Sequence, residues 1–368
     1  MRLGTLLFAL VTMTAHAQQA PTKVKISFVE ALAPNDTTSS VRYQGMYEET
    51  ISIASTLLKK KLSGCGYELE TKTAFYEATD SLKAKEHGEA AQAAGAWLIV
   101  GPRRSNHYLL LVQGAGEIPT VSLMASADAI KELGPRHLSV APLNSQMSAL
   151  AAQETKRRLG KAVRYVSVLS ADCISCLDFA KSFDHAAKEI GLRKLGETSL
   201  TGDSLDADSI RKQVQELKPD FVLLPNYSRI SSMVMAAFND SSSRPFFVGG
   251  DGWGDALYGF VQNGMSIENV KGITVRGFPP FRRALSQFPL GKKIIEQNKL
   301  SDSFAPDLSI LKIMEATADR LCKDRPVSKS EFAASFAKSA RQISAPWGVS
   351  VFDLEKGNIK FSKSAVIR

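Results

Sequence analysis

Apolar and polar residues along this chain follow two patterns in alternating segments, the two-residue repeat of strands and the three-to-four-residue spacing of helices. Residues 24–29 alternate apolar and polar side chains, which predicts a half-buried strand, whereas residues 45–62 carry apolar side chains at helical spacing and lead to Gly64. Short apolar runs such as 97–100 are typical of strands buried on both faces of a parallel sheet. The first half of the pattern predicts strands at 24–29, 67–75, 97–100, 120–123 and 138–140, with helices at 45–62, 79–94, from 105 and at 127–133.

The alternation begins again at Ser145 and runs to Gly249. It predicts helices at 145–159, 174–190, 205–217 and 229–238, and strands at 163–169, 195–200, 221–224 and 246–249. Regular alternation of strand and helix implies parallel sheets with helices on both faces, and two such series imply two lobes. The predicted fold class is therefore α/β, with two doubly wound Rossmann-like lobes.

The residues after Gly272 are too few for a third series. They predict a strand at 273–276, helices at 285–298, 308–322 and 329–339, and strands at 349–352 and 359–362. We expect them to complete the two lobes, so that the chain crosses between lobes more than once, as in a hinged clamp. The expected division is residues 22–141 with about 277–340 in lobe 1, and residues 142–276 with about 341–368 in lobe 2.

The first seventeen residues have the pattern of a secretory signal. Arg2 is their only charge, and the apolar run Leu3–Met13 is too short to span a bilayer. Ala15 and Ala17 are small residues at the two positions that a signal peptidase reads, which predicts cleavage after Ala17 and export. The alternative is a buried N-terminal segment. No cysteine follows the run, so a lipid anchor is not indicated.

Composition and charge narrow the function class. The chain has 368 residues, 44% hydrophobic and 23% charged, with a formal net charge of +9. These values are ordinary for a globular protein, and such a core needs no metal scaffold. Basic residues are spread along predicted helix faces, as at 59–61 and 156–158, without the interleaved aromatic residues of a single-strand binder. We therefore expect a solvated basic surface and no nucleic-acid partner.

Catalytic motifs are missing, apart from one pair of cysteines. There is no phosphate-binding glycine loop, nucleophile elbow, metal-ligand spacing of histidines or Ser/His/Asp set, so we expect no enzyme, cofactor or metal. Cys173 and Cys176 form a C-x-x-C at a predicted helix start, where the helix dipole lowers a thiol pKa. A structural disulfide or two unreactive thiols is favoured over a redox dithiol. Cys65 and Cys322 form a second pair if the C-terminal helices return to lobe 1.

Several predicted strands end in residues suited to a ligand. Two loops, Gly101–Ser105 and Ser122–Ser126, lead into helix N-termini, whose free N–H groups favour an anion. On the other lobe, Tyr227 supplies an aromatic wall and Asp251 ends a strand within Gly-Gly-Asp-Gly-Trp. Each feature alone also fits a helix cap or a turn. Together they suit a zwitterion such as an amino acid, bound at the carboxyl ends of the strands.

These segments resemble a known family. The stretches "KISFVEALAP", "WLIVGPRRS", "IPTVSLMAS", "VSVLSADCISCLDFAKSF", "GETSL", "PDFVLLPNYS" and "FFVGGDGWGDAL" are similar, in order and spacing, to the periplasmic leucine/isoleucine/valine-binding proteins, the type I solute-binding components of ABC transporters. The resemblance implies two lobes with three crossovers, a ligand enclosed by hinge closure, and periplasmic location. It also implies a monomer whose partners are a small-molecule ligand and an ABC permease in the inner membrane.

The resemblance also implies roles for single residues. Ser105, Ala125 and Ser126 would hold the ligand carboxylate, Asp251 the amino group, and Tyr227 would line the pocket.

The chain departs from the family at several pocket positions. Ser175 and Cys176 replace a common Tyr-Gly, Arg103 and Arg104 replace small residues at the cleft mouth, and Arg229 follows Tyr227. The cations suggest a more acidic ligand than leucine, unless they point to solvent. The set of expected ligand-binding residues is Ser105, Ala125, Ser126, Ser175, Tyr227, Asp251, Trp253, Arg103 and Arg104.

The sequence thus favours a non-enzymatic, exported solute-binding protein for a small amino-acid-like or carboxylate ligand. Two alternatives stay open at this point. One is a ligand-sensing module for a membrane receptor, and the other is a periplasmic thiol-redox protein that uses Cys173 and Cys176.

Overall fold

The computed structural model of the chain describes residues 20–32, 37–160, 163–201, 206–242, 244–253, 266–277, 286, 289–296, 307–338 and 348–365. The predicted signal segment and its cleavage site after Ala17 lie outside these residues, as does part of the helix predicted at 285–298.

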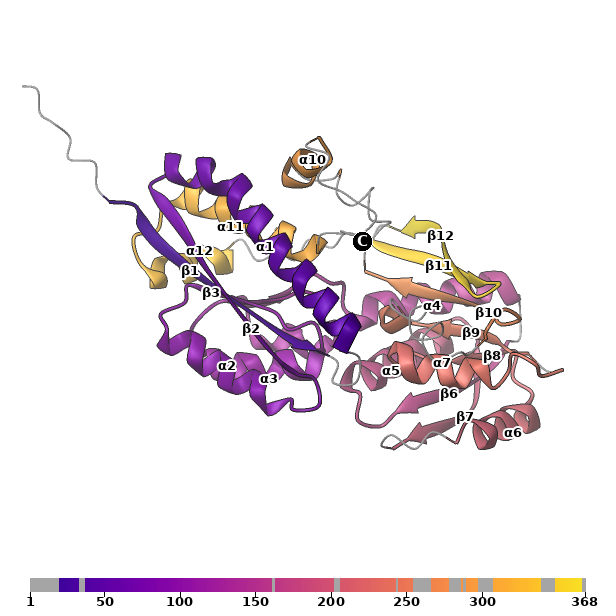
Figure 1. Cartoon of the computed structure of the whole chain (residues 1–368). Helices are drawn as coiled ribbons and strands as arrows, with labels where there is room; N and C mark the ends of the chain where they lie inside the picture. The colour runs from indigo at the N-terminus through magenta and orange to yellow at the C-terminus, as the bar shows by residue number, and fades with distance from the viewer. Residues whose placement is uncertain are drawn as a thin grey trace, which may run out of the picture.

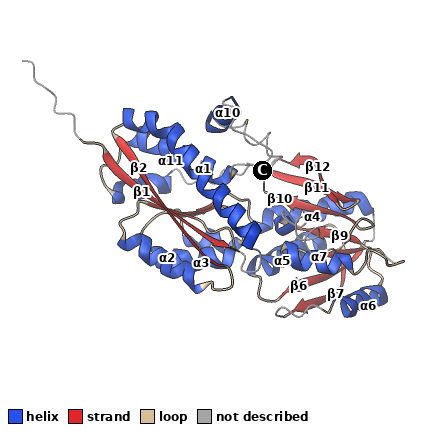
Figure 2. Ribbon diagram, in the orientation of Figure 1, coloured by secondary structure: helices blue, strands red, loops and turns tan. Residues whose placement is uncertain are grey.

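Within the described residues, two separate sheets form the framework of the molecule, as Figure 1 and Figure 2 show. Sheet A is parallel, in the order β2-β1-β3-β4-β5, with β1 (Thr22–Leu32), β2 (Tyr67–Glu77), β3 (Leu98–Val100), β4 (Thr120–Ser122) and β5 (His137–Ser139). Sheet B has the order β12-β11-β10-β9-β8-β6-β7, with β6 (Arg164–Ser170), β7 (Arg193–Leu200), β8 (Phe221–Leu223), β9 (Phe246–Gly249), β10 (Lys271–Arg276), β11 (Val349–Glu355) and β12 (Asn358–Ala365). Its strands β6 to β10 are parallel, and β11 and β12 add an antiparallel edge.

Helices cover both faces of sheet A and together with it form lobe 1. One face packs against helices from both ends of the chain: α1 (Thr37–Gly64), α10 (Pro289–Glu296), α11 (Leu308–Asp324) and α12 (Lys329–Lys338). The other face packs against α2 (Leu82–Ala93) and α3 (Ser105–Ala115), and the short 3₁₀ helix η1 (Asp128–Leu133) follows β4. A disulfide between Cys65 and Cys322 joins the end of α1 to α11, as expected if the C-terminal helices return to lobe 1.

Sheet B and its helices form lobe 2 in the same three-layer manner. The helices α4 (Asn144–Leu159) and α5 (Ile174–Glu189) bury one face. The helices α6 (Ala207–Leu217) and α7 (Ser228–Ala236) bury the other. Because apolar side chains of each sheet are covered on both faces, the strands carry the wholly apolar runs noted in the sequence.

The described elements pass from one lobe to the other after β5, after β10 and after α12. The first two crossings touch. A Cβ atom added at Gly277, which follows β10, would lie 2.2 Å from Cδ of Pro142, which follows β5. Gly277 therefore lets two crossing segments lie in direct contact.

Several element bounds differ from the predictions. The first helix begins at Thr37 rather than at residue 45. The prediction was wrong because the first turns of this helix are polar and show no helical spacing of apolar residues. β1 and β2 pair over their full lengths, from Thr22 with Tyr67 to Leu32 with Glu77, so both strands are longer than their apolar centres indicate. Among the described residues, no helix is long and apolar enough to cross a membrane.

Candidate functional site

The carboxyl ends of the strands of both sheets face each other between the lobes. Lobe 1 contributes the loops that follow β3 and β4, and lobe 2 contributes those that follow β6, β8 and β9. This is the edge at which ligands bind in open α/β sheets.

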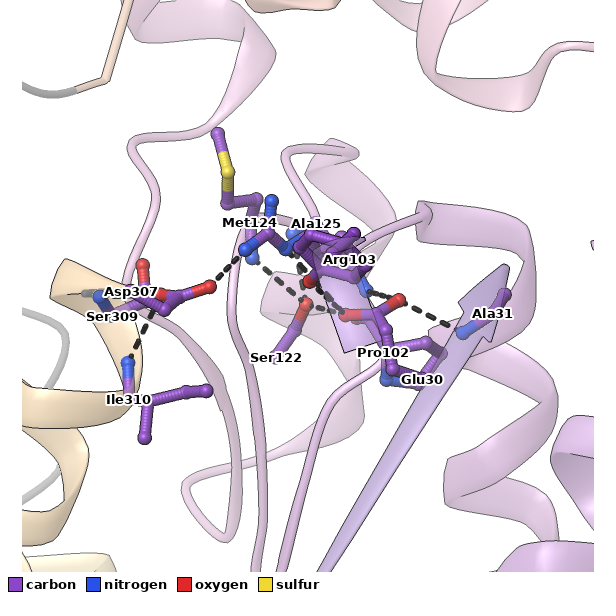
Figure 3. Close-up of polar contacts among 11 residues, drawn as sticks. Glu30, Ala31, Pro102, Arg103, Ser122, Met124, Ala125, Asp307, Ser309 and Ile310 are labelled. Atoms are coloured by element: carbon purple, nitrogen blue, oxygen red, sulfur yellow. Dashed lines mark hydrogen bonds and ion pairs between the residues drawn. The ribbon is translucent and has the colours of Figure 1, made fainter. Parts of the chain in front are cut away.

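In lobe 1, two serine hydroxyls tie together the loops that follow β3 and β4. The Ser122 hydroxyl donates to the carbonyl oxygen of Pro102 (2.6 Å) and accepts the amide of Ala125 (2.8 Å), as Figure 3 shows. The Ser105 Oγ accepts the amides of Ser126 and Ala127, each at 3.2 Å. The amides of the second loop therefore already have partners within lobe 1.

Arg103 is held by carboxylates of its own lobe. Its side chain pairs with Asp307 at the start of α11 and lies 3.5 Å (Nε to Oε2) from Glu30, at the end of β1 (Figure 3). Its amide also donates to Glu30, and its guanidinium lies 4.7 Å from the ring centre of Tyr43. Burial raises the pKa of Glu30, and Arg103 opposes that rise. These contacts give Arg103 a role in joining β1, the loop after β3 and α11.

Arg104 reaches the other lobe. It is the N-cap residue of α3, and its guanidinium lies 5.3 Å from the ring centre of Tyr227 in lobe 2. That distance is within the range of a cation–π contact. The two neighbouring arginines therefore contact different lobes, Arg103 its own and Arg104 the other.

Tyr227 is positioned by the residue before it. Asn226 is fully buried, accepts the Ser170 amide (2.8 Å) and donates to the Val168 carbonyl oxygen (2.8 Å). This amide side chain fastens the turn after β8 to the end of β6, and Tyr227 is the N-cap residue of α7, where it faces Arg104 of lobe 1. Burial raises the pKa of Tyr227 to about 12, against the effect of Arg104.

Trp253 belongs to the core of lobe 2 rather than to the cleft. Its side chain is 0% exposed, and its Nε1 donates to the Leu224 carbonyl oxygen (2.8 Å). The indole lies where a Cβ atom of Gly249 would be, at 2.1 Å from Cε2, so only glycine fits at that strand end. The aromatic residue therefore fixes the turn that presents Asp251.

Asp251 opens the short helix η2 (Asp251–Trp253) and is partly buried. Burial raises the pKa of its carboxyl to about 6, while a hydrogen bond from Ser126 and the charge of Arg276 oppose that rise. Since Ser126 belongs to lobe 1, this hydrogen bond crosses between the lobes. The backbone amides of Asp251 and Gly252 also favour the ionised form, and a desolvated carboxylate of this kind suits a ligand that brings a charged donor.

Ser175 extends this hydrogen-bonded group from Ser126 to Asn144. Its hydroxyl lies 3.1 Å from that of Ser126 and accepts from Nδ2 of Asn144 (3.2 Å). Because Ser126 donates to Asp251, it accepts from Ser175, and a directed chain runs from Asn144 through both serines to Asp251. Ser175 is one of the two residues between Cys173 and Cys176, which form a disulfide.

Sequence reasoning missed Asn144 and its neighbour Asp178, which lie where the two lobes touch. Asn144 is fully buried at the first position of α4 and also donates to Asp178 (3.1 Å), which accepts the amide of Asp128 from lobe 1 at 2.6 Å. The available signal was an asparagine directly after the first crossing.

The structure brings together five of the predicted site residues: Ser126, Ser175, Tyr227, Asp251 and Arg104. It buries Ser105 and Ala125 behind them, and it places Arg103 and Trp253 in the supporting framework.

Within the described residues, no group of three or more His, Cys, Asp or Glu side chains is placed to hold a metal ion.

Comparisons with known proteins find relatives by structure alone. No protein-family model matches the chain, and no curated protein matches it in sequence. Its structure is similar to a leucine-binding protein from Thermotoga maritima, with 16% identity, a TM-score of 0.77, and coverage of 93% of this chain and 99% of the other. A branched-chain amino acid transporter substrate-binding protein from Streptococcus pneumoniae, in complex with isoleucine, has 14% identity, a TM-score of 0.68 and coverage of 93% and 100%.

A third similar structure has a different kind of ligand. It is an ABC-transporter solute-binding protein from R. palustris in complex with benzoate, with 14% identity, a TM-score of 0.68, and coverage of 94% of this chain and 97% of the other. At such identities the likeness establishes the fold. It confirms the predicted fold class, the two-lobed fold of type I periplasmic binding proteins, over nearly the whole chain.

Proposed function

We propose that this protein is the soluble solute-binding component of an ABC transporter, which captures a small amino-acid-like or carboxylate solute between its lobes and delivers it to a permease in the inner membrane. The observation that carries the proposal is the meeting of a cation from lobe 1, Arg104, and a carboxylate from lobe 2, Asp251, around Tyr227. Proteins of the same fold bind leucine, isoleucine or benzoate, which supports a carboxylate-bearing ligand.

Hinge closure is the mechanism that this arrangement supports. The ligand would contribute a donor to Asp251 and an anionic group to lobe 1, and closure would exclude water from both contacts. Charges interact several-fold more strongly at an effective dielectric constant of about 20 than in bulk water at about 80. A ligand that neutralises both lobes would therefore favour the closed state.

Export belongs to the same proposal. The apolar segment that ends at Ala17 would direct the chain to the periplasm, where both cysteine pairs can persist as disulfides. The Cys173 and Cys176 side chains are 7% and 1% exposed, which favours a structural disulfide over a thiol-exchange function.

A thermal-shift screen of the purified mature protein tests the proposal. L-amino acids, dicarboxylates and aromatic acids are added singly, and at least one is expected to raise the melting temperature by several degrees. For an amine-bearing ligand, the Asp251→Ala variant is expected to lose the shift, although without ligand it melts no lower than the unaltered protein. If no compound in these three classes changes the melting temperature of the unaltered protein, the proposal is wrong.

A further inference from the structure

We infer that Arg104 is the residue that binds the carboxylate of the ligand, in place of the loop amides that the family resemblance implies. The inference rests on the proposed function and makes Arg104 the specificity-determining residue of the cleft. It predicts that the solute is an organic acid whose carboxylate faces lobe 1 and whose ammonium or hydroxyl group faces Asp251.

The contrast between Arg103 and Arg104 is the first reason. Arg103 pairs with Glu30 and Asp307, whose side chains are 2% and 4% exposed, so its charge is compensated inside lobe 1. Among the described residues, the contact found for the Arg104 guanidinium is with the neutral ring of Tyr227. A partly buried cation of this kind gains most from an anion that arrives with the ligand.

The position of Arg104 on α3 is the second reason. The N-terminus of a helix carries a partial positive charge, so a cation there is unfavourable, and N-cap positions favour Ser, Thr, Asp or Asn. Arg104 occupies this position and its side chain makes no capping hydrogen bond. Folding therefore gives no reason for an arginine here, whereas an anion held between Arg104 and the free amides of the first turn of α3 would be stabilised by both.

The loop after β4 is the third reason. The amides of Ala125, Ser126 and Ala127 donate to Ser122 and Ser105 inside lobe 1. An anion that used those amides would have to displace these bonds. The Arg104 guanidinium can bind an anion without displacing a hydrogen bond of this loop.

Arg104 shares its surroundings in lobe 1 with the carboxylates of Glu30, which pairs with Arg103, and of Asp80, which is exposed. Tyr76 and His107 lie close enough to feel the field of Arg104, and they hydrogen-bond to each other (2.9 Å, Oη to Nδ1). Burial, with a further contribution from Arg104, lowers the pKa of His107 to about 4, so the imidazole is neutral at pH 7. Since Glu30 is already paired with Arg103, Arg104 is the cation of this region whose guanidinium lies against lobe 2 and can receive an incoming carboxylate.

Two adjacent substitutions test the role of Arg104 without any ligand. Arg103→Gln leaves two buried carboxylates without their cation and is expected to lower the melting temperature by about 5 °C. Arg104→Gln removes a cation from a helix N-terminus and is expected to leave the melting temperature within about 2 °C of the unaltered protein. A fall for Arg104→Gln as large as that for Arg103→Gln would show a structural role and overturn the inference.

Binding is then measured by calorimetry with matched acids and amides: L-leucine with L-leucinamide, L-glutamate with L-glutamine, and benzoate with benzamide. For an acid that binds the unaltered protein, Arg104→Gln is expected to weaken binding roughly 10- to 100-fold. Arg104→Lys is expected to weaken it less, because it keeps the charge but not the planar fork. The control is Arg193→Gln, which removes an exposed charge at the start of β7 and should leave binding unchanged.

The outcomes separate the two proposals. Equal affinity of the unaltered protein and Arg104→Gln for a bound acid would overturn the role of Arg104 while the solute-binding function stands. An amide, or an amine without a carboxylate, that binds as tightly as its acid would also overturn it. If no acid or amide binds the unaltered protein, the proposed function fails, and the inference fails with it.

Discussion

The charge of the Asp251 carboxylate is opposed by burial and favoured by the Ser126 hydroxyl, by the backbone amides of Asp251 and Gly252 and by the charge of Arg276. Burial raises the pKa of Asp251 from 3.8 to about 6, although Ser126 and Arg276 favour the ionised form. The folded protein therefore binds a proton at this site more tightly than the unfolded chain does. Between about pH 4 and pH 6, stability should fall as pH rises, and the whole cost of the desolvated charge is present above pH 6.

An asparagine at this position should remove that cost. Asp251→Asn is expected to be more stable than the unaltered protein at pH 7.5, by about 1–3 kcal/mol, because a partly buried charge is replaced by a neutral isostere. The advantage should disappear near pH 4, where the unaltered carboxyl is protonated in the folded state. Denaturant unfolding at pH 4, 5, 6 and 7.5 measures the difference, and a constant difference across this range would contradict the assignment.

The two disulfides act on different elements. Cys65–Cys322 joins α1 to α11 across a sequence separation of 257 residues. Cys173–Cys176 spans a sequence separation of 3 at the start of α5. There the Cys173 sulfur accepts the Cys176 amide, and Ser175 faces Asn144 and Ser126. The first is placed to stabilise lobe 1, and the second is placed to orient a cleft residue.

Paired serine substitutions should separate these effects. Replacing Cys65 and Cys322 is expected to lower the free energy of unfolding by up to about 5 kcal/mol, since a long closed loop restricts the unfolded chain most. Replacing Cys173 and Cys176 should cost less stability, about 2 kcal/mol, because the loop is short. It should nevertheless weaken binding of the best compound of the thermal-shift screen more than the first pair does. The reverse ranking of affinities would show that the short disulfide does not orient Ser175.

At the scale of the whole molecule, motion between the lobes depends on the crossings. Gly277 touches Pro142 where two crossings run side by side. Gly277→Ala is expected to force these segments apart, to lower stability by about 1–3 kcal/mol and to change the angle between the lobes. Thermal unfolding and the radius of gyration from small-angle scattering report the two effects.

Gly45→Ala provides the matched control for this substitution. Gly45 lies within α1, and a Cβ atom there would meet nothing within 4 Å, so alanine should raise stability by roughly 0.5–1 kcal/mol without changing the radius of gyration. If Gly277→Ala behaves like Gly45→Ala, the contact between the crossings does not constrain the hinge.

Most of the fold could be predicted because its elements have local causes. Buried parallel strands show as short apolar runs, helices show as apolar residues three and four apart, and both patterns are present from β1 to β12. The start of α1 at Thr37 could not be predicted, since its polar first turns carry no period. The division of the C-terminal third between two lobes is a prediction made by counting incomplete series.

The site was predicted less completely, because its geometry depends on distant residues. Arg103 and Arg104 look equivalent in sequence, yet Glu30 and Asp307, which lie 73 and 204 positions from Arg103, engage only one of them. Trp253 follows Asp251 closely but turns into the core, where Gly249 leaves room for its ring. Asn144 gave no signal beyond its place after a crossing.

The division of the C-terminal third has a consequence for the order of synthesis. The apolar face of sheet A that α1 begins to cover is completed by α11 and α12, and sheet B gains its antiparallel edge only with β11 and β12. Nearly the whole chain must therefore be synthesised before either lobe can complete its core. The disulfide of Cys65 can form only after Cys322 has been synthesised.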